Sequence, residues 1–358
     1  MGRAGFEPRL ESLRGIAALI VAIHHGMSAF ATTPSDYSGL AGTLIIWLLW
    51  ITNPATSVIF FFVLSGFVLG LALKRDGAFI AFVVRRCFRI LPMFTLSVLL
   101  AYVCVTIVRI EPSPSGLAPY FQHTFWPGPQ ISDLIDNLAL NNFQVNGPSW
   151  SIYPEVVGSL LLPPLVYAHR RVNPRWRWLL FVVLTAILAF TKYRFVIWFY
   201  CGFFLPGEIA KLPINSLTRP LLFAAGYLID RYIGGFPLEY KFYMILPSSI
   251  GGAMMIGAVI SSPAFMLWLS SSPMRFAGRV SYSFYLLHWP IFYLSAIGYL
   301  SLGLPPGFAG NVMVCGGSIA VALVASWITY VAIEMPTIEL GRRLTRTAGE
   351  RFRPSIPR

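Results

Sequence analysis

Ten apolar segments follow one another along the chain, separated by short stretches that carry most of its charges. Of its 358 residues 56% are hydrophobic and only 11% are charged, whereas a soluble protein of this size carries about a quarter charged residues. The pattern therefore predicts an all-α polytopic membrane protein with about ten transmembrane helices. The expected spans are 15–31, 54–73, 90–109, 148–168, 179–191, 195–210, 220–235, 243–262, 280–300 and 311–333.

Two regions leave the boundaries of these spans open, namely 40–53 and 211–242. The apolar stretch 40–51 could be a re-entrant piece or an extension of the second span. The first span also resembles a secretory signal peptide, with Ala29-Phe30-Ala31 as a cleavage site. Because a histidine pair is unusual inside a segment that is removed, we expect this span to be retained.

Basic residues are distributed unevenly around the spans, and this predicts the orientation of the chain. With the N-terminus in the cytoplasm, 22 of the 27 lysines and arginines fall on the inner side and 5 on the outer side. Such an excess marks cytoplasmic loops, so both termini are expected to be cytoplasmic. The net charge of +13 is then explained by topology, and no nucleic-acid partner is expected.

The sequence divides into one large membrane domain and a short tail. We expect residues 1–340 to form the membrane domain and 341–358 a basic, disordered cytoplasmic tail that contacts lipids. Four widely spaced cysteines form no Cys-x-x-Cys pattern, so they predict neither a disulfide framework nor a metal site.

The first span carries an arginine at its start and a histidine in its middle. Arg14 and His25 are eleven residues apart, or about 1,100° around a helix, which places both side chains on one face and about 16 Å apart along the axis. His24 points about 100° away from that face. An ionisable residue inside a membrane is costly, so His25 is a functional candidate.

Arginines also cluster before the third span. Arg86 and Arg89 share a helical face, and Arg14 lies on the same side of the predicted membrane. Arginine pairs of this kind often serve only as cytoplasmic anchors. Three converging guanidinium groups could instead bind an anion that arrives from the cytoplasm.

Other polar residues stand inside or beside later spans. Ser151 and Glu155 are one helical turn apart and face the same way, and Glu155 could act in the site or bond to another helix. His288 could be structural, Ser65-Gly66 favours close helix packing, and Glu334 is expected to pair with an arginine.

Six segments, in order along nearly the whole chain, resemble the acyltransferase-3 family of bacterial integral-membrane O-acyltransferases. They are Arg14-x10-His25 within Leu10–Phe30, Phe61-Phe-Val-Leu-Ser-Gly-Phe67, Arg86-x-x-Arg89, Trp150-Ser-Ile-Tyr-Pro-Glu155, Ser281-Tyr-Ser-Phe-Tyr-Leu-Leu-His-Trp-Pro290 and Glu334-Met-Pro336. The chain departs from the family pattern at Tyr153-Pro154, and no SGNH-type domain follows the last span.

The resemblance implies transfer of an acyl group, commonly acetyl, from acyl-CoA to a hydroxyl group of a cell-envelope or exported glycan or lipid-linked acceptor. It also implies the bacterial cytoplasmic (inner) membrane as the location, with membrane lipids as neighbours. On this basis Arg14, Arg86 and Arg89 would hold the anionic donor, acyl-CoA. His25 would act as general base or as a transient acyl carrier, and no metal is expected.

Further residues are expected around the donor-binding arginines and His25. We expect Glu155 to take part in catalysis and Trp150, Ser151 and His288 to contact the substrate; Glu155 or His288 could orient His25. The aromatic residues of the outer loop could stack on sugar rings, namely Tyr120, Phe121, Phe125 and Trp126.

Two functions other than acyl transfer are also compatible with the sequence. Intramembrane His and Glu residues with a basic inner mouth would also suit a proton-coupled exporter, which would move its substrate without consuming acyl-CoA. A non-catalytic lipid-binding scaffold would tolerate replacement of His25. The sequence does not define the oligomeric state.

Overall fold

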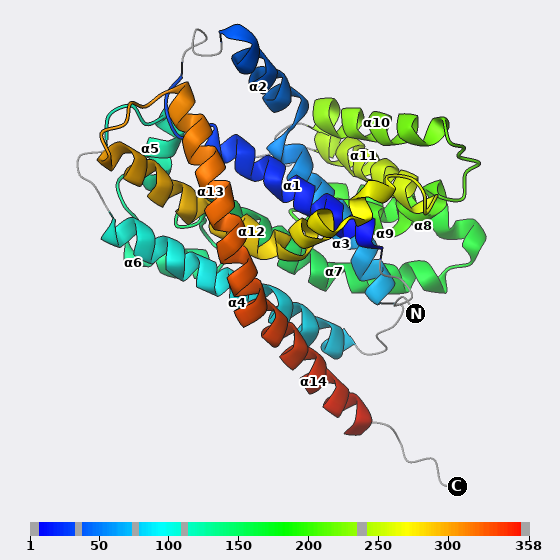
Figure 1. Cartoon of the computed structure of the whole chain (residues 1–358). Coiled ribbons are helices and arrows are strands. Elements are labelled where there is room, and N and C mark those ends of the chain that lie inside the picture. Colours follow the sequence, from blue (N-terminus) through cyan, green and yellow to red (C-terminus); the bar gives the residue numbers. More distant parts are fainter. Residues whose placement is uncertain (1–6, 33–37, 74–78, 109–113, 235–241, 352–358) are drawn as a thin grey trace.

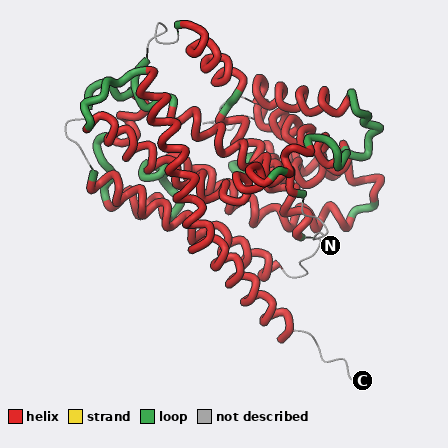
Figure 2. The backbone as a smooth tube through the Cα atoms, viewed as in Figure 1, coloured by secondary structure: helices red, strands yellow, loops and turns green. Residues whose placement is uncertain are grey.

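The computed structural model describes residues 7–32, 38–73, 79–108, 114–234 and 242–351, and all the elements that it contains there are helices (Figures 1 and 2). The predicted all-α class is therefore confirmed. The α-helices are α1 Pro8–Gly26, α2 Gly39–Ile51, α3 Pro54–Ala72, α4 Phe79–Ile107, α5 Pro119–Phe125, α6 Ile131–Leu138, α7 Ile152–Arg171, α8 Arg177–Ala189, α9 Val196–Ile209, α10 Thr218–Ile229, α11 Phe242–Ile260, α12 Ser272–Ser301, α13 Phe308–Thr329 and α14 Met335–Arg351.

Each of the ten predicted apolar segments overlaps one of these helices. Three helical runs among the described residues are long and apolar enough to cross a membrane, and these are Gly39–Ala72, Phe79–Ile107 and Phe308–Arg346. The helices Val196–Ile209 and Met244–Ile260 are apolar but shorter. These features agree with a membrane protein, while the number of ten spans and the orientation of the termini stay predictions.

The uncertain stretch 40–51 forms a helix of its own, α2, which leads directly into α3. The break between them is encoded locally. Asn53 caps α3, since its side chain accepts hydrogen bonds from the backbone N–H groups of Ala55 and Thr56, and Pro54 occupies the first helical position.

Two boundaries differ from the sequence prediction. Helix α4 begins at Phe79, so Arg86 and Arg89 lie within it and not before it. The segment 341–351, expected to be disordered, is helical because it continues α14, while 352–358 lie outside the described residues. Gly341 packs against Phe88 of α4, and Arg85 donates a hydrogen bond of 2.9 Å to Thr345. These contacts order the first part of the predicted tail.

Helix α1 lies in the centre of the arrangement and packs against α3, α12 and α13 (Figure 1). Its backbone touches that of α12 directly, because a Cβ atom on Gly15 would lie 2.6 Å from the backbone of Ala277 and Gly278. A Cβ on Gly278 would likewise lie 2.4 Å from the carbonyl oxygen of Glu11. Only glycine permits this approach, which is a common packing mode of membrane helices.

The start of α1 is fixed by polar contacts to the segment before α12. The side chain of Arg9 is buried and donates to the backbone carbonyls of Ser262 and Phe265, both at 2.6 Å, and pairs with Glu7. Ser12 donates to the carbonyl of Leu269 at 2.7 Å. The helix that carries Arg14 and His25 is thus held at its first turn as well as along its length.

Candidate active site

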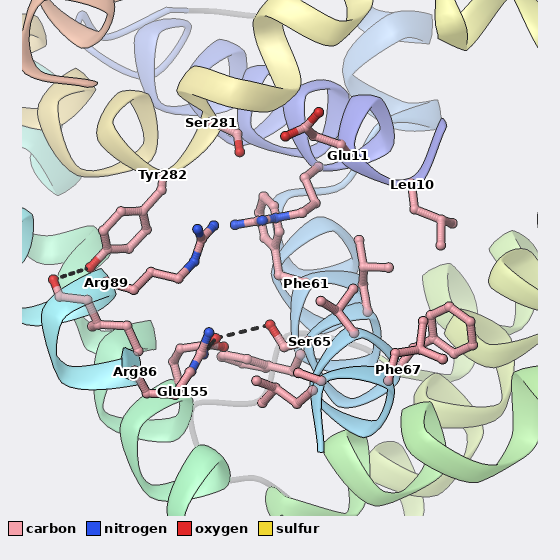
Figure 3. Close-up of a pocket in the computed structure, with 18 of the residues that line it drawn as sticks. Leu10, Glu11, Phe61, Ser65, Phe67, Arg86, Arg89, Glu155, Ser281 and Tyr282 are labelled. Atoms are coloured by element: carbon pink, nitrogen blue, oxygen red, sulfur yellow. Dashed lines mark hydrogen bonds and ion pairs between the residues drawn. The ribbon is translucent and has the colours of Figure 1, made fainter. Parts of the chain in front are cut away.

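A partly open cavity of about 470 Å³ lies between α1, α3, α4, α7, α12 and α14. Its wall combines apolar residues of α3 with charged residues of α1, α4 and α7 (Figure 3). The three arginines that sequence spacing placed together all line it, namely Arg14, Arg86 and Arg89, and so do Ser151 and Glu155. Its lining includes Glu7 and Arg14 from the start of α1 and Arg342 of α14, which belong to segments that the charge distribution predicts to lie on the cytoplasmic side.

Two of these arginines carry charge that no partner neutralises directly. Within the described part of the chain, Arg14 and Arg89 form no hydrogen bond or ion pair, although Arg14 interacts electrostatically with Arg89 and with Glu11 and Glu334. In Figure 3, Arg89 extends into the open space of the cavity. Two nearby cations that lack a paired anion make the cavity a favourable place for a negatively charged group.

The third arginine has a fixed partner. Arg86 forms an ion pair with Glu155 and also donates to Ser159 at 3.1 Å, and Glu155 accepts a further hydrogen bond of 3.1 Å from Ser65 (Figure 3). Glu155 therefore bridges α3, α4 and α7. Its carboxylate neutralises Arg86 and does not contact His25, so the structure places it in the cavity wall.

His25 meets His288 close to Tyr285, a residue of the cavity wall. Nδ1 of His25 lies 2.9 Å from Nε2 of His288, and the rings are nearly parallel with centroids 5.2 Å apart. His288 is fully buried, whereas His25 is partly exposed. The two histidines therefore share one hydrogen bond, and the second ring nitrogen of His25 remains available. His24 points elsewhere and bonds to Thr52.

Tyr285 connects the cavity with the histidine pair. It lines the cavity, its ring centroid lies 5.9 Å from that of His288, and its hydroxyl donates to the carbonyl of Pro148 at 3.0 Å. Phe61 packs edge-on against Tyr285, also at 5.9 Å. Tyr285 is thus shared by the arginine-lined cavity and the surroundings of the histidine pair.

On the other side of His25 stands Trp289, which sequence reasoning did not single out. Its ring lies 4.9 Å from His25, it is fully buried, and its indole nitrogen forms no hydrogen bond with any described residue. Its position beside His288 within the family-like segment 281–290 was the signal that the sequence offered. Arg342 of α14 was also missed as a cavity residue, because the segment was expected to be disordered.

Two of the four outer-loop aromatics, Phe121 and Phe125, differ from the sequence expectation. Phe121 and Phe125 are buried and pack on Trp289, at 6.3 and 5.3 Å between centroids, so they cannot stack on a sugar. Tyr120 is exposed and lies 6.0 Å from Trp289. Apolar side chains that fill a core are indistinguishable from ligand-binding ones in the sequence of a loop.

The contacts of Trp150 and Glu334 differ from those expected from the sequence. Trp150 packs edge-on against Phe62 and is not among the described residues that line the cavity. Glu334 accepts a hydrogen bond of 2.8 Å from Ser283 and interacts electrostatically with Arg89 and Arg14, but it forms no direct ion pair with an arginine among the described residues.

Comparison with known proteins agrees with the acyltransferase resemblance. A family model described as an acyltransferase domain matches residues 7–331. The chain is similar to "Acyltransferase MdmB" of Streptomyces mycarofaciens, with 25% identity over 384 residues that cover 94% of this chain and 93% of that protein. No solved structure matches the chain.

Proposed function

We propose a specific reaction for this chain, which belongs to the acyltransferase-3 family. It transfers an acyl group, commonly acetyl, from cytoplasmic acyl-CoA to a hydroxyl group of a glycan or lipid-linked acceptor. The reaction takes place at the bacterial cytoplasmic membrane. The family establishes an acyltransferase; the donor, the acceptor and the residue roles are our proposal. The observation that carries it is the His25–His288 pair, which Tyr285 links to an arginine-lined cavity.

The cavity suits the head of the donor. Acyl-CoA carries several phosphate charges, and arginine binds phosphate through paired N–H groups. Arg14 and Arg89 both line the cavity and have no directly paired anion among the described residues, so we assign the phosphates to them. The thioester arm would then pass Phe61 and Tyr285 to reach His25.

The histidine pair suits proton transfer. If Nδ1–H of His25 donates to Nε2 of His288, the free Nε2 of His25 carries a lone pair and can accept a proton. His288 would then fix the tautomer and the orientation of His25, as the third member of a catalytic triad does. This assigns to His288 the orienting role that the sequence left open between His288 and Glu155.

The reaction then proceeds as a direct transfer. Nε2 of His25 takes the proton of the acceptor hydroxyl. At the same time the oxygen of that hydroxyl forms a bond to the thioester carbonyl carbon. The tetrahedral intermediate expels the CoA sulfur as its C–S bond breaks, and the imidazolium returns the proton to that sulfur. An acyl-histidine intermediate is the alternative route through the same residues.

The test is release of free CoA thiol by the purified protein from acetyl-CoA with a panel of hydroxyl acceptors. His25→Ala should lower kcat by about 10²- to 10⁴-fold, the usual contribution of a general base. His24→Ala is the matched control, because this neighbouring histidine faces Thr52 and should leave kcat within about twofold. A His25→Ala enzyme that turns over like wild type would refute the assignment. Substrate movement across vesicles without CoA release would favour the exporter.

A further inference from the structure

A second cavity, of about 550 Å³, lies at the junction of α7, α8 and α9, away from the residues assigned to acyl transfer. The residues that line it are His169, Arg170, Arg177, Phe203, Phe204, Gly207, Glu208 and Lys211. We propose that this cavity binds the phosphate group of an anionic phospholipid.

Buried donors without partners point to a missing ligand. His169 is 3% exposed; its Nδ1 lies 3.1 Å from the hydroxyl of Tyr200, but its Nε2 has no partner among the described residues. Nε of Arg177 is likewise buried without a partner there. Because an unsatisfied buried polar group is costly, two of them on one cavity wall indicate an acceptor group that binds there.

The charges of the cavity define that acceptor as an anion. Arg170, Arg177 and Lys211 face one acidic residue, Glu208, which pairs with Lys211. Arg170 is also held by the backbone carbonyls of Gly70 and Leu73 at the end of α3. The guanidinium of Arg177 and the ring of His169 therefore remain as the groups that a phosphate oxygen would engage.

The surroundings favour a lipid over a soluble anion. The rings of Phe203 and Phe204 form the apolar wall, and Trp178 packs on Phe204 with centroids 4.8 Å apart. Next to the cavity, α8 exposes Trp178, Leu179 and Val182. Aromatic and basic residues together mark the level of lipid headgroups, and exposed apolar residues beside a basic pocket suit acyl chains.

The experiment is native mass spectrometry of the full-length protein in a neutral detergent, titrated with phosphatidylglycerol or phosphatidylcholine of the same acyl chains. Wild type should retain phosphatidylglycerol at least about 10-fold more tightly than phosphatidylcholine. Arg177→Gln should lower the phosphatidylglycerol affinity about 10-fold, the usual effect of removing one charge-assisted hydrogen bond.

Arg175→Gln is the matched control, since Arg175 is exposed, lies two residues earlier and is not among the residues that line the cavity. It should bind lipid like wild type, and thermal unfolding curves of both variants would verify that they are folded. Equal retention of the lipid by wild type and Arg177→Gln would overturn the proposal. Displacement of the lipid by millimolar inorganic phosphate or CoA would also overturn it, in favour of a soluble anion.

Discussion

The rings of His25 in α1 and His288 in α12 are in contact, and each histidine lies ten residues after a glycine at which the two helix backbones touch. These glycines are Gly15 in α1 and Gly278 in α12. Both helices therefore run in the same direction, as the predicted topology requires for the first and ninth spans. At 1.5 Å per residue, the backbone contact and the histidine pair are about 15 Å apart along the axes. The glycine crossing thus sets the register in which the two imidazole rings meet.

Replacement of His288 should separate its orienting role from a general structural one. His288→Gln can place an amide near the position of Nε2, whereas His288→Ala cannot. We expect His288→Ala to lower kcat about 5-fold, from the loss of ~1 kcal/mol of hydrogen bonding to His25, and His288→Gln to recover part of that loss. The check is the pH profile of kcat, which should change in shape for His288→Ala. Identical profiles in all three proteins would contradict an orienting role.

Arg89→Gln should weaken donor binding without slowing the chemical step. Loss of one charged hydrogen bond to a phosphate costs about 1.5–3 kcal/mol, so the KM for acetyl-CoA should rise at least about 10-fold while kcat changes little. The measurement is steady-state kinetics at low and high salt, and the salt dependence of KM should shrink in the variant. Arg343→Gln on the exposed side of α14 is the control. A KM equal to that of wild type would remove Arg89 from the donor site.

Glu155→Gln should destabilise the protein because it leaves Arg86 without its counter-charge. The pair is 15% and 17% exposed, so the cost can reach about 3 kcal/mol. A double variant, Arg86→Met with Glu155→Gln, should recover much of this loss in thermal unfolding. If the double variant is stable but inactive, one member of the pair takes part in the reaction. A single variant as stable as wild type would contradict the structural role.

Gly278→Ala should disturb the contact on which the active-site register depends. The added Cβ would lie 2.4 Å from the carbonyl oxygen of Glu11, and such overpacking costs about 1–3 kcal/mol. Both the midpoint of thermal unfolding and kcat should fall. Gly298→Ala, on the same helix but with no atom within 4 Å of the added Cβ, should resemble wild type. Equal behaviour of the two variants would show that the crossing is not tight.

Glu7, which precedes the first apolar span, gives a pH-dependent contribution to stability. Its hydrogen bond from Arg9 lowers the pKa of the Glu7 carboxyl below its usual 4.5. This stabilisation is therefore complete above the ordinary pKa and is lost as the pH falls through the lowered pKa. Wild type should unfold at a higher temperature than Glu7→Gln at pH 6–8, and the difference should disappear in acid. A constant difference down to the lowest pH would rule out the carboxylate as its source.

The sequence predicted the helices and the grouping of the arginines, because both depend on patterns of nearby residues. Helical spacing placed Arg14 and His25 on one face, and the side on which each arginine falls brought Arg14, Arg86 and Arg89 to one cavity. Apolar runs predicted the helices. These features require only the pitch of a helix and the direction of each span.

Partner choice could not be predicted, because it depends on which helices pack together. The sequence offered several possible partners for the carboxylate of Glu155. Its pairing with Arg86 follows from the packing of α4 against α7. His25 and His288 are 263 residues apart in sequence, so nothing local couples them. The later part of α14, from Gly341 onwards, was polar enough to suggest a free tail, but contacts of Gly341 and Thr345 with α4 order it.

In the proposed mechanism Arg14 binds the donor and His25 carries out the chemistry, and both belong to helix α1. The distance between these two positions is therefore set by the number of residues between them and cannot be adjusted gradually. Insertion of one residue between them would lengthen the span by about 1.5 Å, but it would also turn His25 by about 100° away from His288. Donors with longer or shorter acyl groups must therefore be accommodated by side chains around His25. The proposed mechanism therefore implies that acyl-chain preference diverges in evolution through substitutions around His25 and not through insertions in α1.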